Sequence, residues 1–248
     1  MDKSKLVVVI DPGHGGSDPG ASGNGVVEKI ANMNTSIGCK NYLEAQGIKV
    51  LMTRSNDVYV SLDERTRYEN KITAQYPNHK VVFLSVHHNS GGGDRMEAIH
   101  SIYYGDATEI AKSIADNMEK ELGQQKKVYS KKNSAGNADY YAVIRNTKCS
   151  AVIVEVAFLD NKNDVQICDT VGEQKRNGEV IARGLMKWAK ITPVSGSNGS
   201  GNVNTSTNKK TMYRVVVGSY KDKNNANKVL NDAKNKGFKD AFLVAVDV

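Results

Sequence analysis

The sequence predicts an α/β fold: a three-layer sandwich whose twisted, mostly parallel sheet is flanked by helices, followed by a small βαβ module at the C-terminus. Two observations lead to this prediction. Over residues 1–192 of the 248-residue chain, short apolar runs alternate with longer segments of helical periodicity. Residues 193–208, which contain no charged or aromatic side chain, then separate this body from the rest.

In the body, five apolar runs are interpreted as buried strands and four segments as helices. The expected strands are Leu6–Ile10, Lys49–Thr53, Val81–Val86, Ile99–Tyr104 and Ala151–Val156. The expected helices are Glu28–Gln46, Leu62–Tyr76, Ala107–Leu122 and Val171–Ala189. The first three helices are followed directly by Gly47, Pro77 and Gly123, residue types that commonly end a helix.

The C-terminal segment repeats this pattern on a smaller scale. A strand is expected at Tyr213–Val217, a helix at Asn224–Lys236 and a second strand at Ala241–Val246. Two strands and one helix rarely fold alone. The module is therefore expected to pack on the body or on a second copy of itself. The predicted domains are therefore 1–192, a flexible linker at 193–208, and 209–248.

The charge distribution, the cysteines and the length of the apolar runs limit the kinds of function that the protein can have. Residues 209–248 hold nine Lys or Arg against four Asp, +5 of the formal net charge of +7, which suggests an acidic or polysaccharide partner. The three cysteines form no C-x-x-C pair, which argues against a disulfide framework or a zinc knuckle. No apolar run approaches the about 18 residues of a membrane span, so no stable membrane insertion is expected.

Chemically useful side chains cluster where the expected strands end. His14 follows the first strand within a glycine-rich run, and His87 and His88 follow the third. Glu155 lies near the end of a later strand, and Glu28 opens the first helix. Because ligands bind at the carboxyl ends of strands in open α/β sheets, these residues are expected at one rim. Histidines with a glutamate, and another carboxylate beside them, suit a catalytic zinc site.

Each of these residues also has a purely structural interpretation. His14 could shape a tight turn, and Glu28 could be an acidic residue stabilised by the helix dipole. Since His87 and His88 are adjacent, they point to opposite sides of the chain, and only one is expected to reach a metal. Glu155 is the hardest to explain structurally, because a carboxylate in an apolar strand is costly unless it is paired or binds a metal.

Six motifs in order resemble one enzyme family over about residues 6–190. They are Asp11-Pro12-Gly13-His14-Gly15-Gly16, Glu28, Thr53-Arg54, Ser61-Leu62-Asp63-Glu64-Arg65, Ser85-Val86-His87 and Val154–Asn161. The chain is similar here to the zinc-dependent N-acetylmuramoyl-L-alanine amidases of the type 3 family. This resemblance implies zinc on His14, Glu28 and His87, with Glu155 as the catalytic carboxylate. His88 stands where the family usually has a small residue, and Ala157 where it usually has glycine.

The resemblance implies a peptidoglycan hydrolase that uses zinc-activated water to cleave the amide bond between N-acetylmuramic acid and L-alanine of the stem peptide. Residues 209–248 resemble half of a sporulation-related (SPOR) repeat, a peptidoglycan-binding module, and two such halves could pair into a homodimer. The alternatives are a zinc carboxypeptidase acting on stem peptides and a non-catalytic peptidoglycan-binding protein.

A nucleotide- or nucleic-acid-binding function is set aside. The glycine-rich loop Gly13–Gly25 lacks both the P-loop lysine and the G-x-G-x-x-G spacing, and the basic tail has no platform of stacking aromatics. The N-terminus, Met1-Asp2-Lys3-Ser4-Lys5, does not resemble a secretory signal. The expectation is cytoplasmic synthesis and action on the wall after release, through a holin or by mother-cell lysis. Met212 is a conceivable internal translation start.

Overall fold

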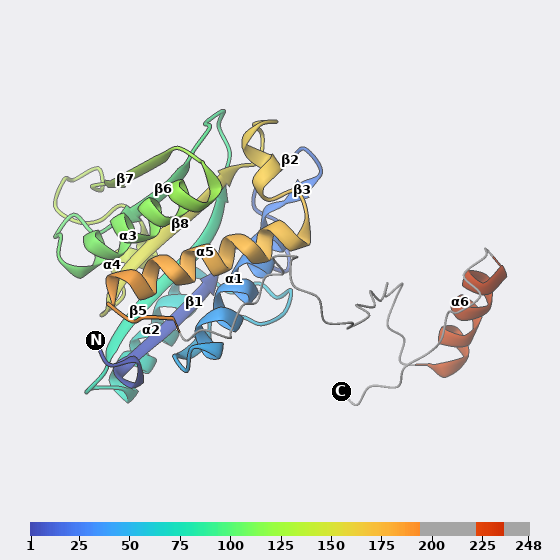
Figure 1. Cartoon of the computed structure of the whole chain (residues 1–248), viewed down its shortest axis with the longest axis horizontal. Coiled ribbons are helices and arrows are strands. Elements are labelled where there is room, and N and C mark those ends of the chain that lie inside the picture. The colour runs from blue at the N-terminus through green and yellow to red at the C-terminus, as the bar shows by residue number, and fades with distance from the viewer. Residues whose placement is uncertain (194–221, 236–248) are drawn as a thin grey trace, which may run out of the picture. The chain divides into compact units, whose positions relative to one another are not determined.

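A six-stranded sheet forms the centre of the body (Figure 1). The computed structural model describes residues 1–193 and 222–235, and the chain divides into two compact units, 1–201 and 202–248. The strands, in spatial order, are β4 (Lys49–Met52), β1 (Leu6–Pro12), β5 (Lys80–Asn89), β8 (Ser150–Phe158), β6 (Met96–His100) and β7 (Lys126–Ser130).

All neighbouring strands pair in parallel except β6 and β8. The prediction of a mostly parallel sheet is therefore confirmed. This topology places the carboxyl ends of β1, β5 and β8 at one edge, together with the amino ends of β6 and β7.

Helices cover both faces of the sheet. On one face lie α1 (Glu28–Ala45), α3 (Asp106–Leu122) and α5 (Val171–Trp188), and Figure 1 shows α5 crossing in front of the sheet. On the other face lie α2 (Leu62–Gln75) and the short α4 (Ala142–Arg145). Val8 packs in the core on the α1 side and Val7 in the core on the α2 side, so β1 is buried on both faces. This explains its continuous apolar sequence and confirms the three-layer architecture.

One predicted strand is misplaced. The run Ile99–Tyr104 was expected to be extended, but β6 ends at His100, and the chain then turns. The turn is fixed by Asp139, which accepts hydrogen bonds from the Ser101 hydroxyl at 2.8 Å and the Ile102 amide at 2.7 Å. Tyr104 then adopts a φ of 56°, which no strand residue has.

Several short elements have no counterpart in the sequence prediction. They are β7, α4, the hairpin of β2 (Ser22–Gly23) and β3 (Val26–Val27), and two 3₁₀ turns, η1 (Lys3–Lys5) and η2 (Asp164–Ile167). The hairpin matters for function, because it connects the glycine-rich loop to the start of α1.

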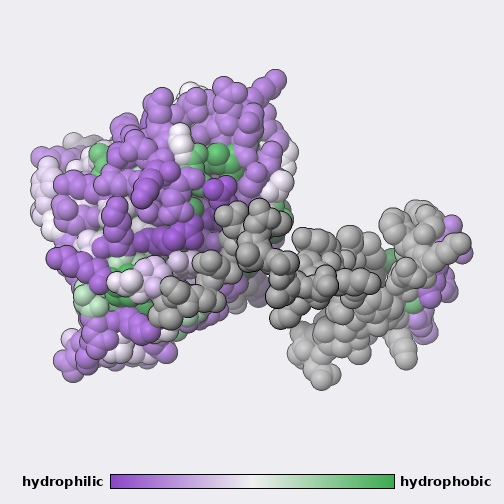
Figure 2. All heavy atoms as spheres, in the orientation of Figure 1, coloured by the Kyte–Doolittle hydropathy of each residue, from purple (hydrophilic) through white to green (hydrophobic). Residues whose placement is uncertain are grey.

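In the second unit, helix α6 spans Lys223–Asn235, within one residue of the predicted helix. The predicted strands Tyr213–Val217 and Ala241–Val246, and the predicted linker beyond residue 193, lie outside the described residues. Among the helices of residues 1–193 and 222–235, none is long and apolar enough to cross a bilayer. The face of the first unit seen in Figure 2 is mainly hydrophilic. All three cysteines are free thiols.

Candidate metal centre

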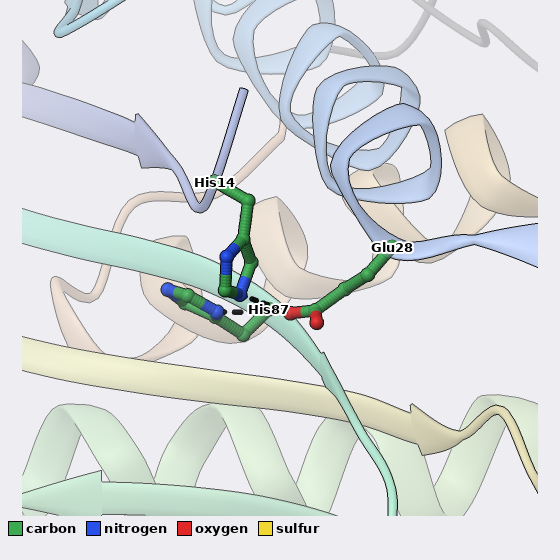
Figure 3. A group of neighbouring side chains, drawn as sticks. All are labelled: His14, Glu28 and His87. Carbon is green, nitrogen blue, oxygen red and sulfur yellow. Dashed lines mark hydrogen bonds and ion pairs between the residues drawn. The ribbon is translucent and has the colours of Figure 1, made fainter. Parts of the chain in front are cut away.

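Three side chains from separate segments converge at the edge of the sheet where β1 and β5 end (Figure 3). His14 follows β1, Glu28 is the first residue of α1, and His87 lies near the end of β5. Oε1 of Glu28 is 3.1 Å from Nε2 of His14 and 3.0 Å from Nδ1 of His87. One ligand atom from each residue lies within 4.8 Å of the other two, so a single cation could contact all three.

The parallel pairing of β1 with β5 brings the two histidines together. Pro12 is the register partner of Val86, and the Gly13 amide donates to the Val86 carbonyl oxygen at 2.9 Å. Gly13 leaves room for the imidazole, because a Cβ at this position would lie 2.2–2.6 Å from ring atoms of His87. The glycine therefore allows His87 to approach the loop that carries His14.

Two buried arginines hold that loop. His14 has a φ of 59°, in the left-handed region that non-glycine residues seldom adopt. The Arg65 guanidinium donates to the His14 carbonyl oxygen at 2.9 Å, and its charge is balanced by Asp11 at 2.7 Å. Arg54 donates to the Gly13 carbonyl oxygen at 2.9 Å. These contacts fix the backbone and so the direction of the His14 imidazole.

Glu28 is the anion of the group. Its side chain is buried, and Oε2 accepts a hydrogen bond from the Ala21 amide at 2.7 Å. Burial by itself would raise the pKa of Glu28, but hydrogen bonds from His14 and His87 hold it well below its usual value. Burial disfavours a charged His14, yet Glu28 and Asp18 raise the pKa of His14 to about 9. Binding of a divalent cation would therefore displace protons from the imidazoles.

Asp18 orients the His14 ring. Its Oδ2 lies 2.8 Å from Nδ1 of His14, so the other ring nitrogen, Nε2, is the one directed at Glu28. A carboxylate on the outer nitrogen is the usual support of a metal-binding histidine. Sequence analysis missed this role, although Asp18 stands four positions after His14 in the same loop.

Glu155 lies beside this group without belonging to it. In the parallel pair β5–β8 it is the register partner of His87, so both side chains share one face of the sheet. Oε2 of Glu155 is buried and has no hydrogen-bond partner among the described residues. Burial raises the pKa of Glu155 to about 7. An unpartnered buried carboxylate oxygen calls for a water, a cation or a substrate atom beside it.

His88, the neighbour of His87, points elsewhere. Its Nδ1 lies 2.7 Å from Oδ1 of Asn32 on α1, and burial lowers the pKa of His88 to about 4. Of the four side chains that sequence analysis singled out, His14, Glu28 and His87 are brought together, and Glu155 is next to them in the sheet.

Comparison with known proteins identifies two family models in the chain. A model described as N-acetylmuramoyl-L-alanine amidase matches residues 8–187, and a model described as SPOR domain matches residues 188–245. The second match covers the predicted linker and all but the last three residues of the predicted C-terminal module.

Two similar relatives are amidases of Bacillus species. The sporulation-specific N-acetylmuramoyl-L-alanine amidase of Bacillus subtilis (strain 168) is 30% identical over 239 residues, which are 96% of this chain and 84% of that protein. The N-acetylmuramoyl-L-alanine amidase CwlM of Bacillus licheniformis is 34% identical over 242 residues, 97% of this chain and 85% of that protein.

Solved structures share the fold. Cwp6 from Clostridium difficile aligns with a TM-score of 0.69 and 32% identity over 74% of this chain and 29% of that one. The N-acetylmuramoyl-L-alanine amidase AmiC2 of Nostoc punctiforme aligns with a TM-score of 0.64 and 26% identity over 75% of this chain and 98% of that one. The chain therefore belongs to the N-acetylmuramoyl-L-alanine amidase family, whose members hydrolyse peptidoglycan, and it carries a SPOR domain after its amidase domain.

Proposed function

We propose that His14, Glu28 and His87 bind a zinc ion and that Glu155 is the general base for hydrolysis of the muramoyl–L-alanine amide bond. The observation that carries this proposal is the convergence of the three donors at one sheet edge. Two imidazole nitrogens and one carboxylate oxygen are a common ligand set of catalytic zinc. Bound there, zinc would supply Lewis-acid polarisation of the scissile carbonyl and a lowered pKa for the attacking water.

The protein's own part in the reaction is proton transfer and positioning. Glu155 takes a proton from the attacking water and returns it to the leaving nitrogen of L-alanine. A carboxylate with a pKa of about 7 suits both steps, because near neutral pH it can accept a proton and release it again. Asp18, Arg54 and Arg65 keep His14 in place during this exchange.

Digestion of purified peptidoglycan with and without EDTA tests the proposal. New N-terminal alanine without new reducing sugar, abolished by EDTA and restored by zinc, is the expected result. Activity that persists after complete metal removal would contradict it. Release of stem-peptide residues without new N-terminal alanine would instead indicate the carboxypeptidase alternative, and no release at all would indicate a binding protein.

We also propose that residues 1–192 are the catalytic domain, 193–208 a linker and 209–248 a wall-binding module. The SPOR match supports a wall-binding module after the amidase domain, and the boundary at 208 rests on the uncharged sequence of 193–208 and the net positive charge of 209–248. A chain truncated after residue 192 is then expected to hydrolyse soluble muramoyl peptides normally but to sediment less with insoluble peptidoglycan. Light scattering of both chains tests pairing through the tail, which predicts a dimer only for the full chain.

For biological context, we propose that the enzyme acts on the wall when a sporulating mother cell lyses, rather than after release by a phage holin. Support comes from the SPOR match and from the sporulation-specific relative. Expression in a sporulating host that lacks its own lytic amidases is expected to restore spore release, whereas the Glu155→Gln variant is not.

A further inference from the structure

A second carboxylate, Glu97, stands directly beside Glu155. The two residues are register partners in the antiparallel pair β6–β8, so their side chains point to the same face with Cβ atoms about 5 Å apart. Together with His87, they form a row across three neighbouring strands, β5, β8 and β6. The mechanism proposed above uses His87 and Glu155 but leaves Glu97 without a role.

Glu97 is saturated with hydrogen-bond donors, unlike Glu155. Its side chain is only 5% exposed, and Oε1 contacts Arg95 through Nε at 2.8 Å and Nη2 at 2.5 Å. Oε2 accepts from the Tyr129 hydroxyl at 3.1 Å, and Nζ of Lys127 lies 3.9 Å from Oε1. Because these contacts hold both carboxylate oxygens, Glu97 is suited to fixing Arg95 in place.

Glu97 therefore fixes the Arg95 guanidinium through Nε and Nη2, while Nη1 is left to bind another group. The central carbon of the guanidinium lies 5.0 Å from the centroid of the Phe158 ring, a stacking contact that leaves the rim of the cation open. The Arg95 side chain is 33% exposed, and Nη1 has no polar partner within the described part of the chain. A guanidinium held on one edge is ready to bind a carboxylate with the other.

The backbone around Arg95 is equally restrained. The Arg95 amide donates to Oδ2 of Asp164 at 3.2 Å, and the Gly91 and Gly92 amides both donate to Asp160 at 2.9 Å. Both aspartates belong to the segment that follows β8, so the loop between β5 and β6 is tied to the end of the strand that carries Glu155.

We propose that Arg95, held by Glu97, binds the free α-carboxylate of the stem-peptide residue next to L-alanine and so helps to select the substrate. The inference rests on the site assignment of the proposed function, which puts the scissile amide at His87 and Glu155. Adjacent strands lie about 4.8 Å apart, which puts the Arg95–Glu97 pair roughly 5–10 Å from that amide. An extended peptide advances about 3.3 Å per residue, so a carboxylate one residue beyond L-alanine falls within reach.

A matched pair of substrates tests this subsite. Both are muramoyl tripeptides with an amidated C-terminus whose second residue is a glutamate joined to the third residue through its γ-carboxyl group, and they differ only in whether the α-carboxyl group of this glutamate is free or amidated. The wild-type enzyme is expected to prefer the carboxylate. Arg95→Ala is expected to raise KM for the carboxylate substrate about tenfold to a hundredfold, with little change for the carboxamide. Arg95→Lys should keep part of the preference, because lysine keeps the positive charge but lacks the planar pair of N–H donors of a guanidinium.

The control is Arg67→Ala, which removes a 70%-exposed arginine on α2 that pairs with Asp63, and it should leave the preference intact. Equal losses on both substrates in Arg95→Ala would show that Arg95 is only the counter-ion of Glu97 and would overturn the proposal. Because that variant removes the nearest cation from the buried Glu97 carboxylate, the double variant Arg95→Met/Glu97→Gln should be compared as well. It is expected to fold and to lose the preference in the same way.

Binding separates failure of this proposal from failure of the proposed function. Calorimetry with the Glu155→Gln chain and the two tripeptides should show weaker binding of the carboxylate form when Arg95→Ala is added. Such a difference would support the subsite even if the wild-type enzyme cleaved neither tripeptide. The lack of cleavage would then count only against the proposed amide hydrolysis. Equal affinity of both peptides for Glu155→Gln would overturn the subsite.

Discussion

The Arg65 guanidinium donates a hydrogen bond to the His14 carbonyl oxygen over 2.9 Å, although the two residues are 51 positions apart in the chain. Arg65 is itself buried and paired with Asp11, so it is part of the interior and not a mobile surface cation. Through this contact, the position of a proposed zinc ligand depends on the packing of α2 against the end of β1.

The Arg65→Lys variant is expected to bind zinc about tenfold to a hundredfold more weakly, as is typical when the support of a metal ligand is lost. Lysine keeps a charge near Asp11, but it cannot bridge Asp11 and the His14 carbonyl oxygen with a planar fork. Competition with a chromophoric chelator measures the zinc affinity. Arg67→Lys is the control, because Arg67 is exposed on the same helix. Unchanged zinc affinity in Arg65→Lys would show that Arg65 acts on stability alone.

The Glu155→Gln variant is expected to keep its bound zinc and to lose about 10²–10⁴-fold in kcat. Glutamine has nearly the same shape but cannot accept the proton of the attacking water. His14→Ala should lose both zinc and activity. Metal analysis and release of N-terminal alanine measure the two properties on the same samples. Near-normal turnover of Glu155→Gln would remove Glu155 from the role of base.

Much of this site follows from the sequence because its residues stand at strand ends. The buried runs that became β1, β5 and β8 are apolar on both faces, and their neighbours in sequence are therefore placed at one edge by the topology. His14, His87 and Glu155 could be assigned to that edge from the sequence alone, because the end of a buried strand can be located without knowledge of tertiary contacts.

The supporting residues could not be assigned in this way. Arg54 and Arg65 stand in the motifs on which the family resemblance rests, but the backbone carbonyl oxygens of Gly13 and His14 that they hold are more than 40 positions away. Likewise, β7 has a polar sequence because it is an edge strand, and the end of β6 depends on Asp139, far along the chain. Such partners are determined by tertiary contacts, which local periodicity does not record.

Stability should also depend on pH through Glu155 in the metal-free protein. Burial raises the pKa of Glu155 from 4.5 to about 7, so between these values the folded state holds a proton that the unfolded state has lost. The wild type is therefore expected to lose about 1–3 kcal/mol of unfolding free energy relative to Glu155→Gln as the pH rises through this window. Urea unfolding in EDTA at several pH values measures the difference.

A second glutamate provides the control for that pH series. Glu109→Gln is the matched substitution, because Glu109 on α3 is 61% exposed and pairs with Lys112 at the surface. A pH dependence of Glu155→Gln no larger than that of Glu109→Gln would mean that Glu155 is ionised without cost in the folded protein. Its side chain would then have to be solvated or paired.

The contact between Gly13 and His87 gives the most direct steric test of the site. In Gly13→Ala, the new methyl group would lie within 2.6 Å of the His87 ring, so the imidazole must move away from Glu28. Zinc affinity and activity should both fall steeply while the circular dichroism spectrum stays that of the wild type. Gly172→Ala is the matched control, because a Cβ there meets only Oγ1 of Thr170, at 3.9 Å. If Gly13→Ala bound zinc as tightly as Gly172→Ala, His87 could leave its observed position without cost to the site, and it would not be a zinc ligand.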